Sequence, residues 1–101
     1  MSMRQATDIS LRVRKKIIAR DSIDGAPCCI YCGAAGNIQI AHFVPRSRGG
    51  IGEETNLACL CPACHEMLDN GDGRAVREVF RDRLERLYPG WKESEQIYTK
   101  W

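Results

Sequence analysis

The spacing of apolar residues near the start of the chain predicts an amphipathic helix. Ile9, Val13 and Ile17 recur three or four positions apart, which brings their side chains to one face of a helix. Asp8 stands just before this pattern and is a residue type that caps helices. A helix is therefore expected over about residues 8–20, and the turn-forming residues at positions 24–27 should follow its end.

The pattern changes from helical to alternating in the middle of the chain. Residues 38–44 alternate between apolar and polar side chains and predict a strand, which Pro45 ends. Residues 45–55 are rich in arginine and glycine and predict a loop. Residues 56–60 predict a second short strand that pairs back on the first.

Two further helices are predicted after this hairpin. Pro62 suits the first turn of a short helix, which Asn70-Gly71 should stop, and a longer helix is expected over about residues 74–88. The apolar residues of the longer helix form one stripe that should face the core: Val76, Val79, Phe80, Leu84 and Leu87. Its other face mixes charges of both signs, which indicates surface ion pairing rather than DNA binding: Arg77, Glu78, Arg81, Asp82, Glu85 and Arg86.

Composition indicates a small protein of one domain, residues 1–101. Hydrophobic residues make up 44% of the 101 positions, so a core is feasible, although a chain this short often needs disulfides or a structural metal for stability. No apolar run approaches the roughly 20 residues that span a bilayer, and no secretory signal begins the sequence. A cytosolic protein without a membrane partner is therefore expected.

Charge is informative in its distribution rather than in its total. The net charge of +2 is only mildly basic, but residues 11–20 carry five cations and no acid: Arg12, Arg14, Lys15, Lys16 and Arg20. Such a stretch is either an ordinary solvated helix face or a patch that follows a DNA backbone. Arg12, Lys15 and Lys16 are the candidates for DNA contact.

Cysteine spacing predicts a structural metal site. Cys29-x-x-Cys32 and Cys61-x-x-Cys64 are two pairs with the spacing of a tetrahedral four-thiolate site, for which zinc is the preferred ion. In a cytosolic chain, six cysteines favour metal binding over disulfides. The other two cysteines, Cys28 and Cys59, are expected to be small buried fillers, although either could replace its neighbour as a ligand.

The residues between the two cysteine pairs carry a recognisable pattern. His42, Asn56 and His65 occur in that order, a Pro-Arg-x-x-Gly-Gly loop begins at Pro45, and Cys-x-x-Cys-His ends at His65. Over a core motif of about residues 28–72, the chain resembles the HNH endonucleases, in the subgroup whose hairpin is flanked by cysteine knuckles. The resemblance implies an α+β fold: a small ββα-metal hairpin and helix, stapled by the zinc site, with flanking N- and C-terminal helices.

The resemblance also implies roles that suit the chemistry of phosphodiester cleavage. His42 would be the general base, because a neutral imidazole can accept a proton from water near pH 7. Asn56 would orient the base or hold the loop, and His65 would bind a catalytic ion such as Mg²⁺, Mn²⁺ or Zn²⁺. Arg46 would hold the scissile phosphate, with Arg48 as a weaker candidate. Each role has a plainer alternative. His42 could simply be packed in the strand, Asn56 could bond the backbone of a turn, and His65 could replace a cysteine in the zinc site. Arg46 and Arg48 could be solvated loop residues.

One position departs from the family pattern. Many members carry Asp or His directly before the base, where this chain has Ala41, which cannot bind metal. Asp69 is the best substitute because it follows His65 by four residues on the same helix, so that both side chains share a face. The spacing resembles that of colicin-type nucleases, in which a second ligand lies one helical turn after the first. Asp69 could instead belong only to the turn at Asn70-Gly71.

These observations predict a metal-dependent endonuclease that binds DNA and hydrolyses its phosphodiester bonds with one divalent ion. The tail resembles that of small phage-encoded members, which implies a setting in the cytoplasm of a bacterial host and a possible partner in terminase or other packaging proteins. The main alternative is a catalytically degenerate module, held together by zinc, that binds nucleic acid or assists packaging. In this alternative, Ala41 shows that a catalytic metal ligand has been lost.

Overall fold

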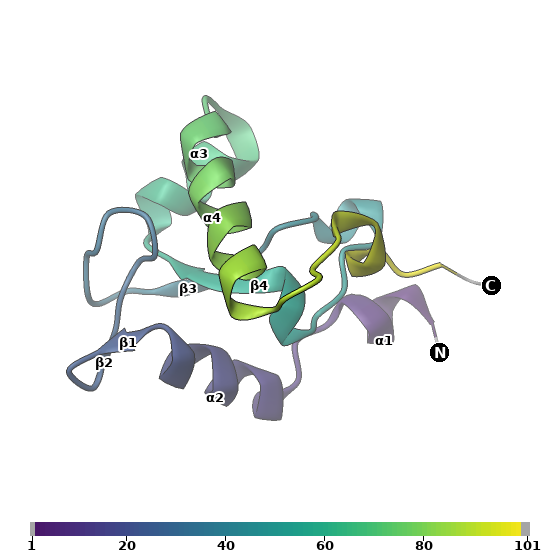
Figure 1. Cartoon of the computed structure of the whole chain (residues 1–101), viewed down its shortest axis with the longest axis horizontal. Coiled ribbons are helices and arrows are strands. Elements are labelled where there is room, and N and C mark those ends of the chain that lie inside the picture. The colour runs from purple at the N-terminus through teal and green to yellow at the C-terminus, as the bar shows by residue number, and fades with distance from the viewer. Residues whose placement is uncertain (1, 100–101) are drawn as a thin grey trace.

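The computed structural model describes residues 2–99, which form helices and two small antiparallel sheets (Figure 1). In chain order, the α-helices and strands are α1 Met3–Thr7, α2 Leu11–Arg20, β1 Ser22–Ile23, β2 Ala26–Pro27, β3 Gln39–His42, β4 Leu57–Leu60, α3 Pro62–Asn70 and α4 Arg74–Leu87. Short 3₁₀ helices lie at Arg46–Arg48, Glu54–Asn56 and Glu93–Gln96. The predicted α+β class is confirmed. None of the helices in this described part is both long and apolar enough to cross a bilayer.

The hairpin of β3 and β4 lies at the centre of the molecule. The strands are antiparallel, as the sequence predicts, with Gln39 opposite Leu60 and His42 opposite Leu57. Pro62 occupies the first turn of α3, and Gly71 ends that helix. The hairpin therefore leads directly into α3, and the arrangement is the expected ββα unit.

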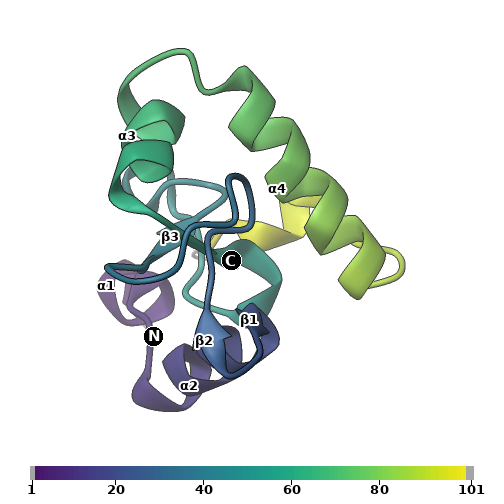
Figure 2. The same cartoon turned by 90° about the vertical axis from the view of Figure 1, so that its left-hand side faces the viewer.

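Helices cover both faces of the hairpin. Ala58 and Leu60 of β4 pack with α3 and α4, whereas Leu57 and Cys59 pack with α2. The four residues of β4 are all buried for this reason. The two views show α2 and α4 on different sides of the β3–β4 hairpin (Figures 1 and 2). His42, at the end of β3, is thus held between elements from both sides.

The N-terminal region differs from the single helix predicted over residues 8–20. Two helices, α1 and α2, are separated by a break at residues 8–10. Ser10, not Asp8, caps α2: its hydroxyl accepts a hydrogen bond from the Val13 amide at 3.1 Å. Asp8 instead follows the last turn of α1 and donates its backbone N–H to the Arg4 carbonyl. Serine and aspartate cap helices equally well, so the sequence pattern could not choose between them.

The apolar stripe of α4 is confirmed only in part. Val76, Phe80 and Leu84 are buried, but Leu87 is 39% exposed. Leu87 lies in the last turn of α4, outside the core cluster, and is covered only in part, and Val79 is half-buried.

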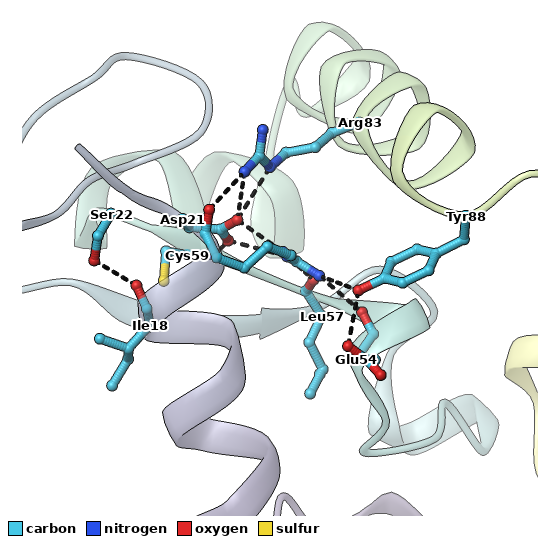
Figure 3. A network of polar contacts seen from close by, with 9 residues as sticks. Ile18, Asp21, Ser22, Glu54, Leu57, Cys59, Arg83 and Tyr88 are labelled. Carbon is cyan, nitrogen blue, oxygen red and sulfur yellow. Dashed lines mark hydrogen bonds and ion pairs between the residues drawn. The ribbon is translucent and has the colours of Figure 1, made fainter.

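A buried ion-pair network joins α2 to α4 and to the hairpin (Figure 3). The Asp21 carboxylate, directly after α2, is fully buried and accepts hydrogen bonds from Arg20 at 2.8 Å and from Arg83 at 2.7 Å. It also accepts the backbone N–H of Cys59 at 2.9 Å. Arg20 extends the network to the Tyr88 hydroxyl at 3.1 Å. One carboxylate therefore holds three elements together.

The pKa of Asp21 has a clear direction. Burial alone would raise the pKa, but the hydrogen bond and charge of Arg20, together with the Cys59 amide and Arg83, outweigh burial and lower it. A carboxylate with a lowered pKa stabilises the fold above its unfolded pKa of about 4, and loses that contribution as the pH falls through its folded pKa. The network is therefore fully charged at pH 7.

We expect Asp21→Asn to lower the free energy of unfolding at pH 7 by about 3 kcal/mol, because two partly buried guanidinium groups lose their counter-charge. Urea unfolding followed by tryptophan fluorescence measures the change. Asp24→Asn removes the same charge from the exposed β1–β2 turn, where less than about 0.5 kcal/mol is expected. Equal effects of the two variants would contradict a stabilising role for the network.

Candidate active site and metal centre

Four cysteines converge between the end of the first sheet and the start of α3. The sulfur atoms of Cys29, Cys32, Cys61 and Cys64 all lie within 4.8 Å of one another, and those of Cys32 and Cys61 are 3.6 Å apart. Four sulfurs bound to one zinc ion at about 2.3 Å would lie about 3.8 Å apart at the corners of a tetrahedron. Within residues 2–99, no other group of three or more His, Cys, Asp or Glu residues could hold a metal ion.

Backbone amides prepare this cluster for metal binding. The N–H groups of Cys32 and Cys64 point to the sulfurs of Cys29 and Cys61, each at 3.5 Å. Burial raises the pKa of the Cys29 thiol, but backbone contacts from Cys32, Cys61 and Tyr31 outweigh it and lower the pKa to about 7. Cysteine binds metal as the thiolate, and backbone N–H groups that point to the sulfurs stabilise this form. The cluster therefore suits a bound cation.

The remaining two cysteines lie outside the cluster, so neither Cys28 nor Cys59 replaces its neighbour as a candidate ligand. Cys59 is fully buried between β4 and α2, where burial raises the pKa of its thiol to about 12. Cys28 is also buried, and its sulfur faces the Ala26 carbonyl at 3.3 Å. Both are packing residues, as predicted.

A cleft of about 630 Å³ beside β3 brings together four of the predicted site residues. His42 comes from β3, Arg46 from the following loop, and His65 and Asp69 from α3. The apolar side chains of Ile9, Ile40, Pro45 and Leu68 line it as well. The cleft is partly enclosed and has the concave form expected of a substrate site.

His42 is oriented by the N-terminal segment. Its Nε2 atom lies 2.9 Å from the Thr7 carbonyl oxygen at the end of α1. A carbonyl only accepts hydrogen bonds, so Nε2 carries the proton and Nδ1 keeps the lone pair. Burial is the largest cause that lowers the pKa of His42, and the nearby charge of Arg46 adds to it. The imidazole is therefore neutral at pH 7.

Gly52 lets the N-terminal segment approach this closely. A Cβ atom at position 52 would lie 2.1 Å from the Asp8 carbonyl oxygen and 2.9 Å from that of Thr7. The Gly52 amide also donates to the Ala6 carbonyl at 2.9 Å. Any larger residue at position 52 would push away the carbonyl that holds His42.

His65 and Asp69 form a pair that fits a cation. His65 Nδ1 lies 2.7 Å from the Gln39 side-chain oxygen, which can only accept, so Nδ1 carries the proton. The lone pair of Nε2 then faces the Asp69 carboxylate at 3.2 Å. Two electron-rich atoms at this distance need positive charge between them, which either a metal ion or a second proton on His65 would supply.

Ala41 lies apart from these ligands. Its side chain is fully buried in the core cluster of α3 and α4, on the other side of β3 from His42. The cleft therefore offers a divalent ion one nitrogen and one carboxylate from α3, and water and substrate would complete its coordination shell.

Asn56 holds the loop rather than facing the cleft. Its side chain is fully buried and bonds both the amide and the carbonyl of Val44, at 2.9 and 3.2 Å, and the Ile51 carbonyl at 2.9 Å. The loop is so tight that a Cβ atom at Gly50 would lie 1.7 Å from the Val44 carbonyl oxygen. Of the two roles predicted for Asn56, the geometry fits loop support.

The predicted DNA-binding residues do not all gather at the cleft. Arg46 lines it, but its guanidinium is paired with the Asp8 carboxylate. Arg48 is exposed and is not among the residues that line the cleft. Arg12, Lys15 and Lys16 are exposed on α2 and also lie outside the lining, and Lys16 is 3.8 Å from Glu54.

Sequence reasoning missed two arginines that line the cleft, Arg14 and Arg77. Arg14 was one of five cations on α2, and nothing in the sequence singled it out. Arg77 belonged to the charged face of α4, for which ion pairing was predicted. Arg81 does pair with Glu93 at 2.6 Å and also lies over the Phe43 ring at 5.1 Å, and Arg77 lies over the same ring at 4.6 Å. Gln39 and the Thr7 carbonyl were missed too, because only the fold brings them to His65 and His42.

Residues 29–71 match the family model described as HNH endonuclease. The matched stretch contains both cysteine pairs, the His42-Asn56-His65 trio and Asp69, so the resemblance predicted from the motif is confirmed. No curated protein matches the chain. Thr7, Arg14 and Arg77 lie outside the matched stretch, and their contributions to the cleft are features of this chain.

Proposed function

Because residues 29–71 match the family model described as HNH endonuclease, we propose that the chain is a metal-dependent DNA endonuclease whose general base is His42. The observation that carries the proposal is the shared cleft. A neutral, oriented imidazole and a histidine–carboxylate pair that fits a cation open into one cleft with Arg46. A protein that only binds nucleic acid has no need of this combination.

The chain's own residues would prepare and align the attacking water. His42 Nδ1 accepts a proton from water, while the Thr7 carbonyl keeps the ring in the required tautomer and stabilises the charged imidazolium. The water oxygen attacks phosphorus in line with the bond to the 3′ oxygen. That bond breaks, the departing 3′ oxygen takes a proton from solvent, and the products are a 5′ phosphate and a 3′ hydroxyl.

His65 and Asp69 would hold the catalytic divalent ion, Mg²⁺, Mn²⁺ or Zn²⁺, through Nε2 and a carboxylate oxygen. When bound, the ion would supply positive charge to the phosphate and to the leaving oxygen. Gln39 orients His65 through Nδ1, as the partners of metal-bound histidines commonly do. The cysteine cluster would hold a structural Zn²⁺ that fixes the start of α3, and with it both ligands.

Arg46 would bind the scissile phosphate in exchange for Asp8. The Arg46–Asp8 pair is about half exposed on both sides, so a phosphate can replace the carboxylate at low cost. We also propose, on the family resemblance alone, that the hairpin–helix unit enters the minor groove and that the protein acts in the cytoplasm of a bacterial host beside packaging proteins.

A plasmid-nicking assay tests the proposed function. Wild-type protein is expected to nick supercoiled plasmid with added Mg²⁺, Mn²⁺ or Ni²⁺, and excess EDTA should abolish the nicking. His65→Ala and Asp69→Asn should raise the metal concentration for half-maximal nicking by about 10- to 100-fold, since even outer-shell changes at metal sites cost that much. Glu78→Gln changes an exposed carboxylate on α4 that lines neither the cleft nor the hollow beside His65 and Asp69, and should match wild type.

Two results would contradict the proposal. Nicking at the same level in all variants would mean a contaminating nuclease. No nicking by a zinc-loaded wild type that still binds DNA would favour the non-catalytic binding module. The structural argument for that module is a site with only two protein ligands, His65 and Asp69, while Ala41 is buried on the other side of β3.

A further inference from the structure

The three arginines that line the cleft differ in their partners. Arg46 is paired with Asp8. Neither the Arg14 nor the Arg77 side chain forms an ion pair or hydrogen bond with another residue in the range 2–99, although arginines elsewhere on α2 and α4, such as Arg20 and Arg81, do. Asp69 is the one carboxylate among the residues that line the cleft, so these two unpaired cations leave the lining net positive, and such a local field attracts an anion.

Arg77 is held in a fixed position relative to His42. Its guanidinium lies over the ring of Phe43, the residue that follows His42, with 4.6 Å to the ring centroid. Phe43 is fully buried and meets the rings of Phe80 at 5.2 Å and Trp91 at 5.5 Å, both edge to face. A guanidinium stacked on an immobile ring keeps its N–H edge free and has less conformational entropy to lose on binding.

Arg14 reaches the same cleft from the other side of the hairpin. It lies on α2, which Val13 and Ile17 anchor to one face of the hairpin, whereas α4 packs against the opposite face. His42 lies between the two helices, on the strand that both flank. The unpaired arginines thus flank the base from two different elements.

We propose that Arg14 and Arg77 bind phosphates of one DNA strand on either side of the scissile phosphate, so that the strand crosses the cleft from α2 to α4. This inference rests on the proposed function, and it moves DNA contact away from the outward face of α2 that carries Arg12, Lys15 and Lys16. Both anchors lie outside the matched family segment. They define the strand path by charge, without reading its sequence.

Salt-dependent binding tests the inference without cleavage. A fluorescent 20-base-pair duplex is titrated with zinc-loaded protein at 50 to 200 mM salt, with no other divalent ion. Each phosphate contact contributes about 0.9 to the slope of log K against log salt concentration. Arg77→Gln and Arg14→Gln should each reduce the slope by about 1 and weaken binding about tenfold near 0.1 M salt. Arg77→Lys should keep the slope, because the charge remains.

Arg86→Gln is the matched control on α4, because Arg86 is exposed and lies outside the cleft. It should change the slope less than the two cleft variants. Unchanged slopes for Arg14→Gln and Arg77→Gln at wild-type zinc content would overturn the inference, even if the protein nicks DNA. Reduced slopes in a protein that does not nick would support the phosphate anchors and refute the proposed function instead.

Discussion

Replacing His42 with alanine is expected to lower the rate of metal-dependent nicking by about 10²- to 10⁴-fold, the usual contribution of a general base. Of the two imidazoles that line the cleft, His65 is assigned to the metal, and His42 is the one whose proton is held by a backbone carbonyl, that of Thr7. Its removal leaves His65, Asp69 and the cysteine cluster in place. Metal binding and DNA binding should therefore survive while the chemical step fails.

The measurement is the single-turnover rate at saturating Mn²⁺, with zinc content and circular dichroism as checks that the fold is intact. His42→Asn, which keeps a polar side chain but cannot take up a proton, should be as inactive as His42→Ala. If either folded variant kept more than about a tenth of the wild-type rate, His42 would not be the base.

The wild-type pH profile adds a second line of evidence on the same residue. The pKa of His42 is lowered from its usual value near 6.5, chiefly by burial. The neutral, active form therefore grows as the pH rises through this lowered pKa, and the rate should level off below pH 6.5. A limb that continues to rise well above pH 6.5 would contradict His42 as the group that titrates.

Removal of the structural metal is expected to unfold the protein. Binding of zinc to a four-cysteine site contributes roughly 10–16 kcal/mol, which equals or exceeds the total stability of about 5–15 kcal/mol of a typical domain. The cluster joins the segment after β2 to the first turn of α3, so its loss frees the hairpin from the helix. Cys64→Ser should bind no zinc and lose its helical circular dichroism signal.

Neighbouring cysteines provide a matched control for the zinc site. Cys28→Ser alters a thiol adjacent to Cys29 that lies outside the cluster, and its hydroxyl can still face the Ala26 carbonyl. This variant should keep one zinc ion per chain, measured by release to a colorimetric chelator. Zinc loss from Cys28→Ser, or a folded zinc-free Cys64→Ser, would contradict the assignment of ligands.

Several parts of the fold and site could be predicted because they depend on short-range geometry. The helix over Pro62–Asn70, the pairing of the strands around His42 and the convergence of four cysteines follow from periodicity, capping and two-residue spacing. The closeness of His65 and Asp69 follows from one turn of helix. The cap at Ser10 in place of Asp8 shows where even local rules leave two choices.

The sequence by itself indicated most of the residues to which the proposed chemistry is assigned, because their types and spacing are local properties of the chain. Only the tertiary structure decided what surrounds them. The Thr7 carbonyl reaches His42, Asp8 neutralises Arg46, and Arg77 leaves the charged face of α4 to stack on Phe43. These contacts join residues about 35 positions apart, so they depend on which helix packs on which face of the hairpin, and the pattern along a single segment contains no information about that choice.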